Sequence, residues 1–498
     1  MRVVFFEPFA IYSPHFETCL EIMQCHISDG YSVTFIGCDA TLPACEPNPK
    51  HDLAICLRCI SRRNQGLQRL EGGEDIEYLS LTDLSSPPAG DITLTEWKFS
   101  DINELKKYKI KDNDIGMAVA STLISLYRTP TPDFASCRDV LINFLSAAYG
   151  TYYAFNCYLD NNKLDKLYLF NGRFSFLRSV LRSCQEHGVD CFVHERGCNF
   201  HKYSICCNTL PHDIKSFEKR LLESWNKVGD EERRSGAERF YHERAEGKDQ
   251  SWFSFTAGQT KGLLPDNWQS DKLNLVIFNS SEDELAAIGS EWENPIYKDQ
   301  FHGIKKIVSD LSERKEVHLY LRVHPNLKNV NNKSVTSLFE ISSDNFTLIP
   351  ADSKVCTYSL IRSADKIITF GSTVGIEAAF WGTVSILAGM SYYRNLGSVY
   401  LPRNHNELIE MALDDLSPKD TTGAFMYGYY FNSFGVDFKY FEPNGFGSGL
   451  FKGKKIKPSF MITALFLISR LPFLKSGFSK LVEVMQKSII RIMINYSL

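Results

Sequence analysis

Two side chains suited to binding anions, an arginine and a histidine, stand at the end of an apolar run in the second half of the chain. In the segment 318–325, Arg322 and His324 stand two residues apart, and Pro325 comes directly after them. Side chains two apart in a strand project to the same side, and the proline ends the strand. A guanidinium and an imidazole at the carboxyl end of a parallel strand suit a diphosphate. A solvated or locally ion-paired strand edge explains the same residues, and both interpretations stay open.

A second group follows the apolar run 366–370. Gly371, Ser372 and Thr373 come next, and a helical pattern of small residues then contains Glu377. The glycine permits a tight turn, either hydroxyl can cap the helix, and the free N–H groups of a helix start attract an anion. Glu377 stands about one turn further on, where its carboxylate can accept two ribose hydroxyls. The alternative is an ordinary joint between strand and helix, with Glu377 on the surface.

Four cysteines follow the second apolar run of the chain. Cys38, Cys45, Cys56 and Cys59 have the spacing Cys-x6-Cys-x10-Cys-x2-Cys. The last two have the spacing of a metal knuckle, and four thiolates can close a structural zinc or iron–sulfur site. Four reduced thiols are the alternative.

The elements that must position these groups alternate between strand and helix patterns in both halves. The strands expected to carry the candidate groups are listed here: 3–6, 33–36, 166–170, 189–193, 273–278, 318–323, 347–349, 366–370 and 384–387. Helical periodicity lies between them, and 213–250 is helical and highly charged. Repeated β-α-β units in both halves predict an α/β fold with two Rossmann-like, doubly wound domains that face one another.

The expected domain boundaries follow from these patterns. They are an N-terminal Rossmann-like lobe at 1–212, a helical linker at 213–270, a C-terminal Rossmann-like lobe at 271–415, and a wrap-back segment with a basic amphipathic tail at 416–498. In open α/β sheets ligands bind outside the carboxyl ends of the strands, so the candidate groups are placed where a ligand would be expected.

The motifs at 322–325 and 371–378 resemble the nucleotide-binding lobe of bacterial capsule and surface polysaccharide biosynthesis proteins. These proteins are similar to glycosyltransferases of the B-type architecture, with two Rossmann-like lobes around a central cleft. Asn-Gly-Arg at 171–173 and His-Glu-Arg-Gly at 194–197 resemble the N-terminal lobe of the same group. The resemblance implies that Arg322 and His324 face the phosphates of a nucleotide-sugar donor. It also implies that Ser372 and Thr373 cap those phosphates and that Glu377 holds the ribose.

The N-terminal lobe would then bind the acceptor and supply a general base. Glu195 ends an expected strand beside Arg196, where a crevice would open. A carboxylate near a guanidinium stays ionised, whereas burial raises its pKa. Arg173 follows Asn-Gly at a helix start and is the candidate contact to a phosphate or an acceptor anion. Pairing of Glu195 with either arginine explains these residues without chemistry. No Asp-x-Asp motif stands in a convincing loop, so no metal is expected in the catalytic step.

The chain's charge is unevenly distributed. The 498 residues carry 55 Lys and Arg against 59 Asp and Glu, a net charge of −4, which gives no reason to expect a nucleic-acid partner. Residues 452–498, however, contain nine Lys or Arg and one Glu among apolar residues. A cationic, apolar tail on an acidic body predicts contact with an anionic membrane surface. Two interfacial helices at 460–474 and 481–494 fit, and so do two ordinary helices packed on the body.

The chain's ends give an expected location. The first eight residues lack the pattern of a signal peptide, and the apolar run 460–468 is too short to span a bilayer. These features predict a cytoplasmic protein peripheral to the inner membrane, in which most of the 14 cysteines are thiols or metal ligands.

Three functions fit these observations. The first is a glycosyltransferase that moves a sugar from a nucleotide-sugar donor to a capsule, O-antigen or other surface glycan, with a lipid-linked or glycan acceptor. The second is a nucleotide-sugar epimerase, which would need several acid–base residues in one lobe. The third is a non-catalytic capsule assembly or export factor with a degenerate nucleotide site.

Overall fold

The chain forms two compact units. The computed structural model describes residues 1–87, 97–470 and 479–495. Unit 1 comprises Met1–Leu126, Thr131–Asp213 and Gly435–Leu498, and unit 2 comprises Tyr127–Pro130 and Ile214–Phe434. The helical stretch expected to link two lobes thus lies almost wholly in unit 2.

Unit 1 is built on a largely parallel sheet. Among the described residues this sheet has seven strands in the order β12-β6-β5-β4-β1-β2-β3. The strands are β1 (Arg2–Phe6), β2 (Ser32–Gly37), β3 (Glu77–Ser80), β4 (Lys166–Phe170), β5 (Asp190–Arg196), β6 (Lys202–Cys207) and β12 (Val436–Asp437). Strands β1 to β5 are parallel, while β6 and β12 are antiparallel to their neighbours. The chain moves from β1 to one side and then returns with β4 on the other, so the topological switch point lies between β1 and β4.

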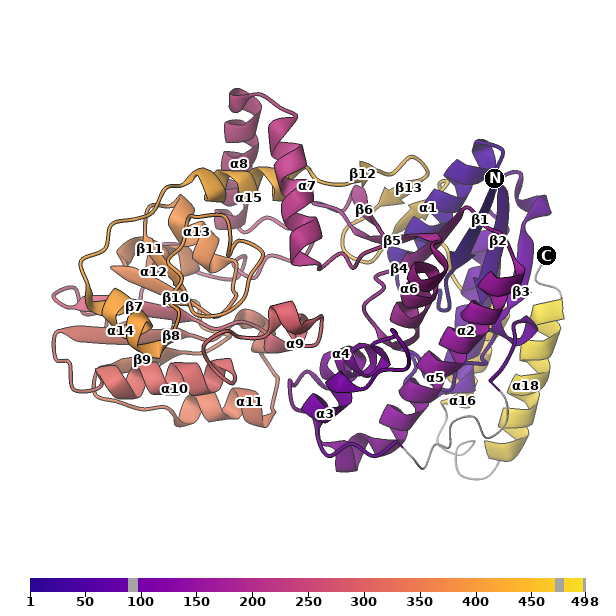
Figure 1. The fold of residues 1–498 in the computed structure, drawn as a ribbon, viewed down its shortest axis with the longest axis horizontal. Coiled ribbons are helices and arrows are strands. Elements are labelled where there is room, and N and C mark those ends of the chain that lie inside the picture. Colours follow the sequence, from indigo (N-terminus) through magenta and orange to yellow (C-terminus); the bar gives the residue numbers. More distant parts are fainter. Residues whose placement is uncertain (88–96, 471–478, 496–498) are drawn as a thin grey trace. The chain divides into compact units, whose positions relative to one another are not determined.

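Helices cover both faces of this sheet (Figure 1). Before β5, the chain of unit 1 forms the helices α1 (His15–Ser28), α2 (Leu53–Leu67), α3 (Ile102–Lys107), α4 (Ile115–Tyr127), α5 (Phe134–Asn161) and α6 (Ser175–His187). Successive residues of a strand face opposite sides of the sheet. Phe5 of β1 accordingly belongs to the same buried cluster as Phe16 of α1, whereas the ring of Phe6 lies 4.8 Å from that of Phe155 in α5.

The chain beyond residue 434 returns to unit 1. After β12 come a two-stranded hairpin, β13 (Phe441–Pro443) with β14 (Gly449–Phe451), and two helices, α16 (Phe460–Ser469) and α18 (Ser479–Asn495). The buried carboxylate of Glu21 in α1 fixes the hairpin, because it accepts hydrogen bonds from three successive backbone N–H groups at 439–441. The expected helical C-terminal tail is therefore present, although 471–478 lie outside the described residues.

Unit 2 contains a smaller, parallel sheet. Its five strands in the described chain run in the order β11-β10-β7-β8-β9. They are β7 (Leu273–Phe278), β8 (Val317–Arg322), β9 (Phe346–Ile349), β10 (Lys366–Thr369) and β11 (Val384–Leu387). All four pairings are parallel. The switch point lies between β7 and β10.

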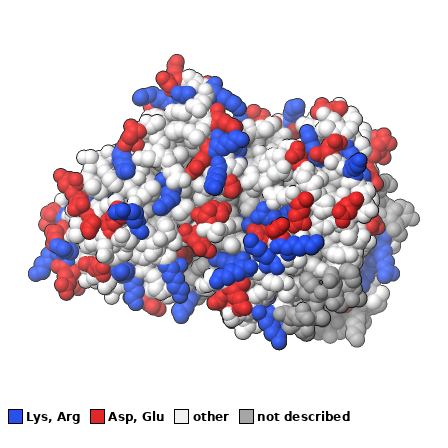
Figure 2. Space-filling model, in the orientation of Figure 1, with Lys and Arg blue, Asp and Glu red and all other residues white. Residues whose placement is uncertain are grey.

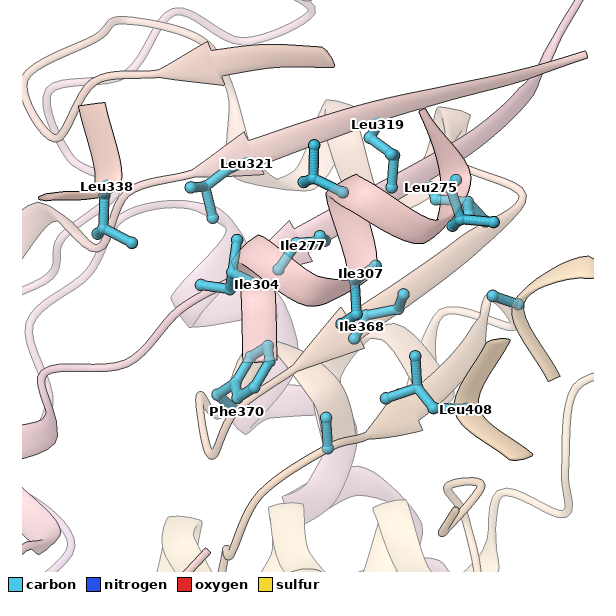
Figure 3. Close-up of a cluster of buried hydrophobic side chains, with 14 of the residues drawn as sticks. Leu275, Ile277, Ile304, Ile307, Leu319, Leu321, Leu338, Ile368, Phe370 and Leu408 are labelled. Atoms are coloured by element: carbon cyan, nitrogen blue, oxygen red, sulfur yellow. The ribbon is translucent and has the colours of Figure 1, made fainter. Parts of the chain in front are cut away.

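The core of unit 2 is divided between the two faces of the sheet. Its helices are α7 (Ile214–Asn226), α8 (Asp230–Ala245), α9 (Glu282–Leu285), α10 (Gln300–Leu311), α11 (Lys333–Thr336), α12 (Thr357–Ser363), α13 (Val374–Phe380), α14 (His405–Leu413) and α15 (Thr422–Ser433). Leu275 and Ile277 of β7 pack with α10 and α14 (Figure 3), whereas Val276 and Phe278 pack on the side of α12 and α13. This alternation confirms the expected doubly wound α/β architecture for unit 2.

Acidic and basic residues are interspersed over the face drawn in Figure 2. No described helix combines the length and hydropathy needed to cross a membrane. All 14 cysteines lie in the described part of the chain, and none of them forms a disulfide there.

Candidate functional site

The motifs of unit 2 lie together at the carboxyl edge of its sheet. Strands β10, β7 and β8 are neighbours, so the loops that follow them are adjacent. The side-chain oxygen of Asn279, after β7, accepts a hydrogen bond from the backbone N–H of His324, 2.8 Å away. The hydroxyl of Ser280 donates to the carbonyl of Phe370, after β10, at 3.3 Å. The loop after β7 therefore joins the two candidate motifs, and it was not singled out from the sequence.

His324 is a neutral hydrogen-bond donor. Its Nδ1 accepts from the backbone N–H of Asn326 at 3.2 Å, so the ring proton resides on Nε2. Burial lowers the pKa of His324 to about 4, and the charge of Arg322 adds to the effect although Asp283 opposes it. The Phe255 ring meets the imidazole edge-on at 5.2 Å. At neutral pH this residue offers an N–H group without a positive charge.

Arg322 is occupied by its own chain. It is 2% exposed, and its guanidinium donates to the carbonyls of Pro350 and Ser353, the latter at 3.1 Å. Burial lowers its pKa to about 10. Its clear contribution is to hold the loop after β9, and its contact with a donor phosphate stays a prediction.

Glu377 is buried in a network of donors. Arg244 of α8 donates to its Oε1 from Nε at 3.0 Å and from Nη2 at 2.9 Å, and the Tyr358 hydroxyl donates to Oε2 at 2.5 Å. Thr373 adds a hydrogen bond from its hydroxyl to Oε1 at 3.0 Å. The alternative that placed Glu377 on the surface is therefore wrong. A ribose hydroxyl would have to share oxygens that these residues already bind.

The turn between β10 and α13 has the geometry expected of Gly371. Its φ is +123°, and a Cβ there would lie 2.6 Å from the carbonyl oxygen of Met390. Ser372 is tied down at both ends, since its hydroxyl accepts from Val374 N at 3.3 Å and its carbonyl accepts from the Tyr393 hydroxyl at 2.6 Å. The turn is therefore rigid, and its contact with phosphate is untested.

A second cation faces the His324 loop. Nε of Arg128 lies 2.5 Å from Asp283 Oδ2, and its Nη2 donates to the carbonyl of Asn326 at 3.3 Å. Ser281 donates to the other oxygen of Asp283 at 2.5 Å. In the sequence, the run of polar residues directly after β7 was the available signal for Ser281 and Asp283.

Glu195 lies at the carboxyl edge of unit 1, as its position at the end of a strand predicted. Asn171 donates from Nδ2 to Oε2 at 2.6 Å, and the backbone N–H of Arg196 donates to Oε1 at 3.0 Å. The Nδ1 atom of His15 lies 3.9 Å from Oε1. Burial raises the pKa of Glu195, although the hydrogen bond from Asn171 and the charge of Arg196 oppose the rise. This is a partly exposed carboxylate that holds a proton more tightly than usual.

Arg173 is buried beside the same turn. Its Nε donates to the hydroxyl of Ser121 at 2.7 Å, and its guanidinium lies 4.9 Å from the centre of the Phe174 ring. Its backbone N–H donates to the side chain of Asn171 at 3.1 Å. Arg173 thus braces the turn that positions the partner of Glu195, and its predicted contact with an anion is untested.

The switch point of unit 1 holds a buried acid and a buried histidine that were not predicted. Glu7 directly follows β1, is 1% exposed, and has no hydrogen-bond partner for either carboxyl oxygen in the described structure. His194 Nε2 lies 3.8 Å from Glu7 Oε2. Burial raises the pKa of Glu7 well above its usual range and lowers that of His194 to about 3. His194 is therefore uncharged near pH 7, and burial favours the protonated form of Glu7. An acid immediately after an apolar strand was the available signal.

Glu46 is a further unpredicted acid. Burial raises its pKa to about 7, although hydrogen bonds from Ser175 and Thr122 oppose the rise. These hydroxyls lie 3.3 and 3.4 Å from Oε1. Glu46 can therefore exchange a proton near neutral pH.

The four clustered cysteines come together around a cavity of about 30 Å3. Cys38, Cys45, Cys56 and Cys59 all line it. Ala10 N donates to Cys59 Sγ at 3.1 Å, and burial raises the pKa of this thiol to about 12. As the side chains stand, no three His, Cys, Asp or Glu residues of the described chain are arranged to hold a metal ion. The structural metal therefore stays a prediction.

No family model matches the chain, and no curated protein sequence does so. Solved structures similar to it include KpsC from Thermosulfurimonas dismutans, a beta Kdo 2,4 transferase, at 14% identity and a TM-score of 0.36, over 61% of this chain and 87% of the other. The spinosyn rhamnosyltransferase SpnG is 12% identical with a TM-score of 0.26, over 87% and 96%. A UDP-N-acetylglucosamine 2-epimerase is 11% identical with a TM-score of 0.24, over 86% and 91%. Each of these is a distant likeness, with a TM-score below 0.5.

Proposed function

We propose that the chain is a glycosyltransferase that moves a sugar from a nucleotide-sugar donor to a surface glycan, with unit 2 binding the donor and unit 1 the acceptor. One observation carries the proposal: Glu195 is a partly exposed carboxylate with a raised pKa, fixed by Asn171 at the carboxyl edge of unit 1. Such a group can take a proton from an acceptor hydroxyl as the glycosidic bond forms.

The donor unit supplies neutral binding groups. His324 can donate from Nε2 to a phosphate oxygen, and the rigid turn at 371–373 offers hydroxyl and N–H groups nearby. The Arg244–Glu377 pair fixes the helix that follows this turn. Binding both substrates in a fixed orientation makes the reaction effectively intramolecular.

A panel of nucleotides tests donor binding. UDP, GDP, CMP, CDP and ADP are each titrated against the purified chain while its thermal midpoint is followed, because a ligand that binds only the folded state raises the midpoint. We expect one nucleotide to do so in the wild type and the exposed His302→Ala control, and much less in His324→Ala. A folded protein that responds to no nucleotide would favour the assembly or export factor.

A nucleotide-sugar epimerase is the second candidate, and a specific observation favours it. Unit 1 contains several buried titratable groups whose pKa values are shifted by burial, among them Glu7, Glu46, His194 and Glu195. Epimerisation needs an acid and a base on one substrate. Incubating the identified donor alone separates the two reactions: an epimerase converts it to the epimeric sugar without acceptor, and a transferase leaves the sugar's stereochemistry intact.

We also propose that the protein acts at the inner face of the cytoplasmic membrane, bound through its C-terminal helices. Apolar side chains of both helices are exposed, among them Phe460 at 89%, Leu467 at 64% and Val484 at 61%. The tail carries nine basic residues against one acid. Apolar contact and attraction to anionic lipid together are sufficient for interfacial binding.

Sedimentation with vesicles tests this location. We expect the chain to bind vesicles that contain phosphatidylglycerol and to be released by salt, and to bind vesicles of phosphatidylcholine weakly. Replacing Phe460 and Val484 by serine should reduce binding, whereas replacing exposed Phe339 of unit 2 should not. Equal binding to both lipids would contradict the electrostatic part of the proposal.

A further inference from the structure

Three helices of unit 1 enclose an apolar cavity that the proposed glycosyl transfer does not use. The cavity has a volume of about 310 Å3 and lies between α2, α16 and α18, which are neighbours in Figure 1. The residues that define it are Ala54 and Leu57 of α2, Leu465 and Phe466 of α16, and Met485 and Ile489 of α18. Its size is at the lower end of the range for small-molecule sites.

The closed end of the cavity is a packed core. Leu57, Ile60, Ile462 and Ile490 are all buried there, so the three helices form a stable wall. The open end continues into the exposed apolar side chains of the tail, among them Ile468. An apolar cavity that opens onto an exposed apolar surface accommodates one narrow, flexible apolar chain better than a rigid or polar ligand.

Two arginines lie against the ring of Phe466, which lines the cavity. The guanidinium of Arg58 lies 4.4 Å from the centre of the Phe466 ring, and that of Arg470 lies 4.8 Å from the same ring. Arg470 is paired with Asp52 at 2.7 Å, whereas Arg58 forms no ion pair with any described residue. A cation without a counter-charge beside an apolar cavity complements a molecule with an anionic head and an apolar chain.

We propose that this cavity binds one acyl chain of an anionic phospholipid, with Arg58 beside the headgroup. The inference deepens the proposed membrane association: the tail does not only lie on the surface but takes up a single lipid chain. Binding is non-covalent and is driven by the apolar area removed from water.

A monomeric lipid tests the site without a bilayer. The probe is lysophosphatidylglycerol with a twelve-carbon chain, held below its micelle concentration and titrated by calorimetry against the full chain. We expect saturable binding, none by glycerophosphoglycerol, which lacks the chain, and weaker binding by the matching lysophosphatidylcholine. Arg58→Gln should remove the preference for the anionic lipid while it leaves binding of the zwitterionic lipid unchanged.

Two tryptophan variants separate the cavity from the surface around it. Leu465→Trp fills the cavity and should weaken binding of the anionic lipid at least tenfold. Leu467→Trp, on the exposed side of the same helix, should leave that binding unchanged. Met485→Trp is a second filling variant on α18, at a position exposed enough to tolerate the larger side chain. Circular dichroism and the thermal midpoint verify that each variant is folded.

The outcomes distinguish the cavity from the membrane proposal. Binding to phosphatidylglycerol vesicles without binding of the monomeric lipid would overturn the cavity and leave membrane association standing. Binding of the monomeric lipid without binding to vesicles would support the cavity and contradict membrane association. Equal lipid binding by Leu465→Trp and Leu467→Trp would also overturn the cavity proposal. So would a protein that binds no monomeric lipid but forms a dimer through its tail, if Leu465→Trp disrupts that dimer.

Discussion

The switch points of the two sheets have the same topology and opposite chemistry. In unit 1 the carboxyl ends of the neighbouring strands β4, β1 and β2 lie at one edge of the sheet. In unit 2 the carboxyl ends of β10, β7 and β8 do the same. At the edge of unit 1, the buried polar atoms of Glu7 and His194 have no hydrogen-bond partners among the described residues. At the edge of unit 2, Glu377 is fully partnered by Arg244 and Tyr358. The same topology thus places an acid and a histidine without hydrogen-bond partners at one switch point and a fully partnered carboxylate at the other.

This difference separates proton transfer from binding. Perturbed pKa values are typical of residues that exchange protons, whereas satisfied ion pairs keep a loop in place. We therefore expect variants in unit 1 to change activity more than stability, and variants around Glu377 to change stability as well.

The largest effect is expected from Glu195→Gln. Glutamine keeps the shape of the side chain and can still pair with Asn171, but it cannot accept a proton, so transfer should fall by 10²- to 10⁴-fold. Measuring kcat with the identified donor and acceptor, next to urea unfolding, gives both quantities. If the folded Glu195→Gln protein kept the wild-type kcat, Glu195 would not be the base. The proposed contrast between the two units would then be wrong as well.

Stability should respond most at the buried pair of unit 2. Arg244→Ala leaves the carboxylate of Glu377 buried without its ion partner, at an expected cost of about 3–5 kcal/mol in the free energy of unfolding. Glu377→Gln should cost less, because the Arg244 side chain is 33% exposed and can reach water. Urea unfolding measures both. Arg403→Ala, in the exposed pair with Glu407, is the control and should change little. A small loss in Arg244→Ala would show that the network does not stabilise unit 2.

Many of the strands and helices were predictable from the local sequence. The expected strands at 273–278 and 384–387 match β7 and β11 to the residue, because a buried parallel strand is a continuous apolar run bounded by turns. Strand β3 was missed, because it is short, lies near the edge of the sheet, and is only partly buried. Helix α2 was missed since its apolar face is interrupted by Arg62 and Arg63, whose charges are compensated by the distant Glu17 and Asp39.

The candidate site was predictable in position but less so in detail. The sequence placed Arg322, His324 and Glu377 at strand ends or helix starts, and the structure places them there. It could not show that Arg322 is bound by carbonyls and Glu377 by Arg244, because those partners are 28 to 133 residues away in the chain. Glu7 could have been recognised from its place after β1, whereas its lack of partners is a tertiary property.

Replacing His324 should lower donor affinity more than stability, which distinguishes its role from that of the Arg244–Glu377 pair. His324→Ala removes one hydrogen bond to a charged phosphate, so the dissociation constant of the donor should rise about 10- to 100-fold. The unfolding free energy should fall far less than in Arg244→Ala. His324→Gln, which retains an N–H donor, should recover part of the affinity. Calorimetric titration checks both variants, and unchanged affinity in His324→Ala would place the donor elsewhere.

The smallest effect is a change in how stability depends on pH, and it probes the protonation of unit 1 directly. The folded pKa of Glu46 is raised to about 7, so this group contributes stability that is complete below the unfolded value of about 4.5 and is lost as the pH rises to 7. His194, with its pKa lowered to about 3, has the opposite sign: its contribution is present above the unfolded value of about 6.5 and declines as the pH falls. Glu46→Gln should therefore flatten the decline between pH 4.5 and 7 by at most about 1.4 kcal/mol per pH unit. Urea unfolding at four pH values measures the slope, and Glu407→Gln is the control because that carboxyl lies outside unit 1. An unchanged slope in Glu46→Gln would mean that Glu46 is ionised at neutral pH, and the protonation contrast between the two switch points would then rest on Glu7, His194 and Glu195 alone.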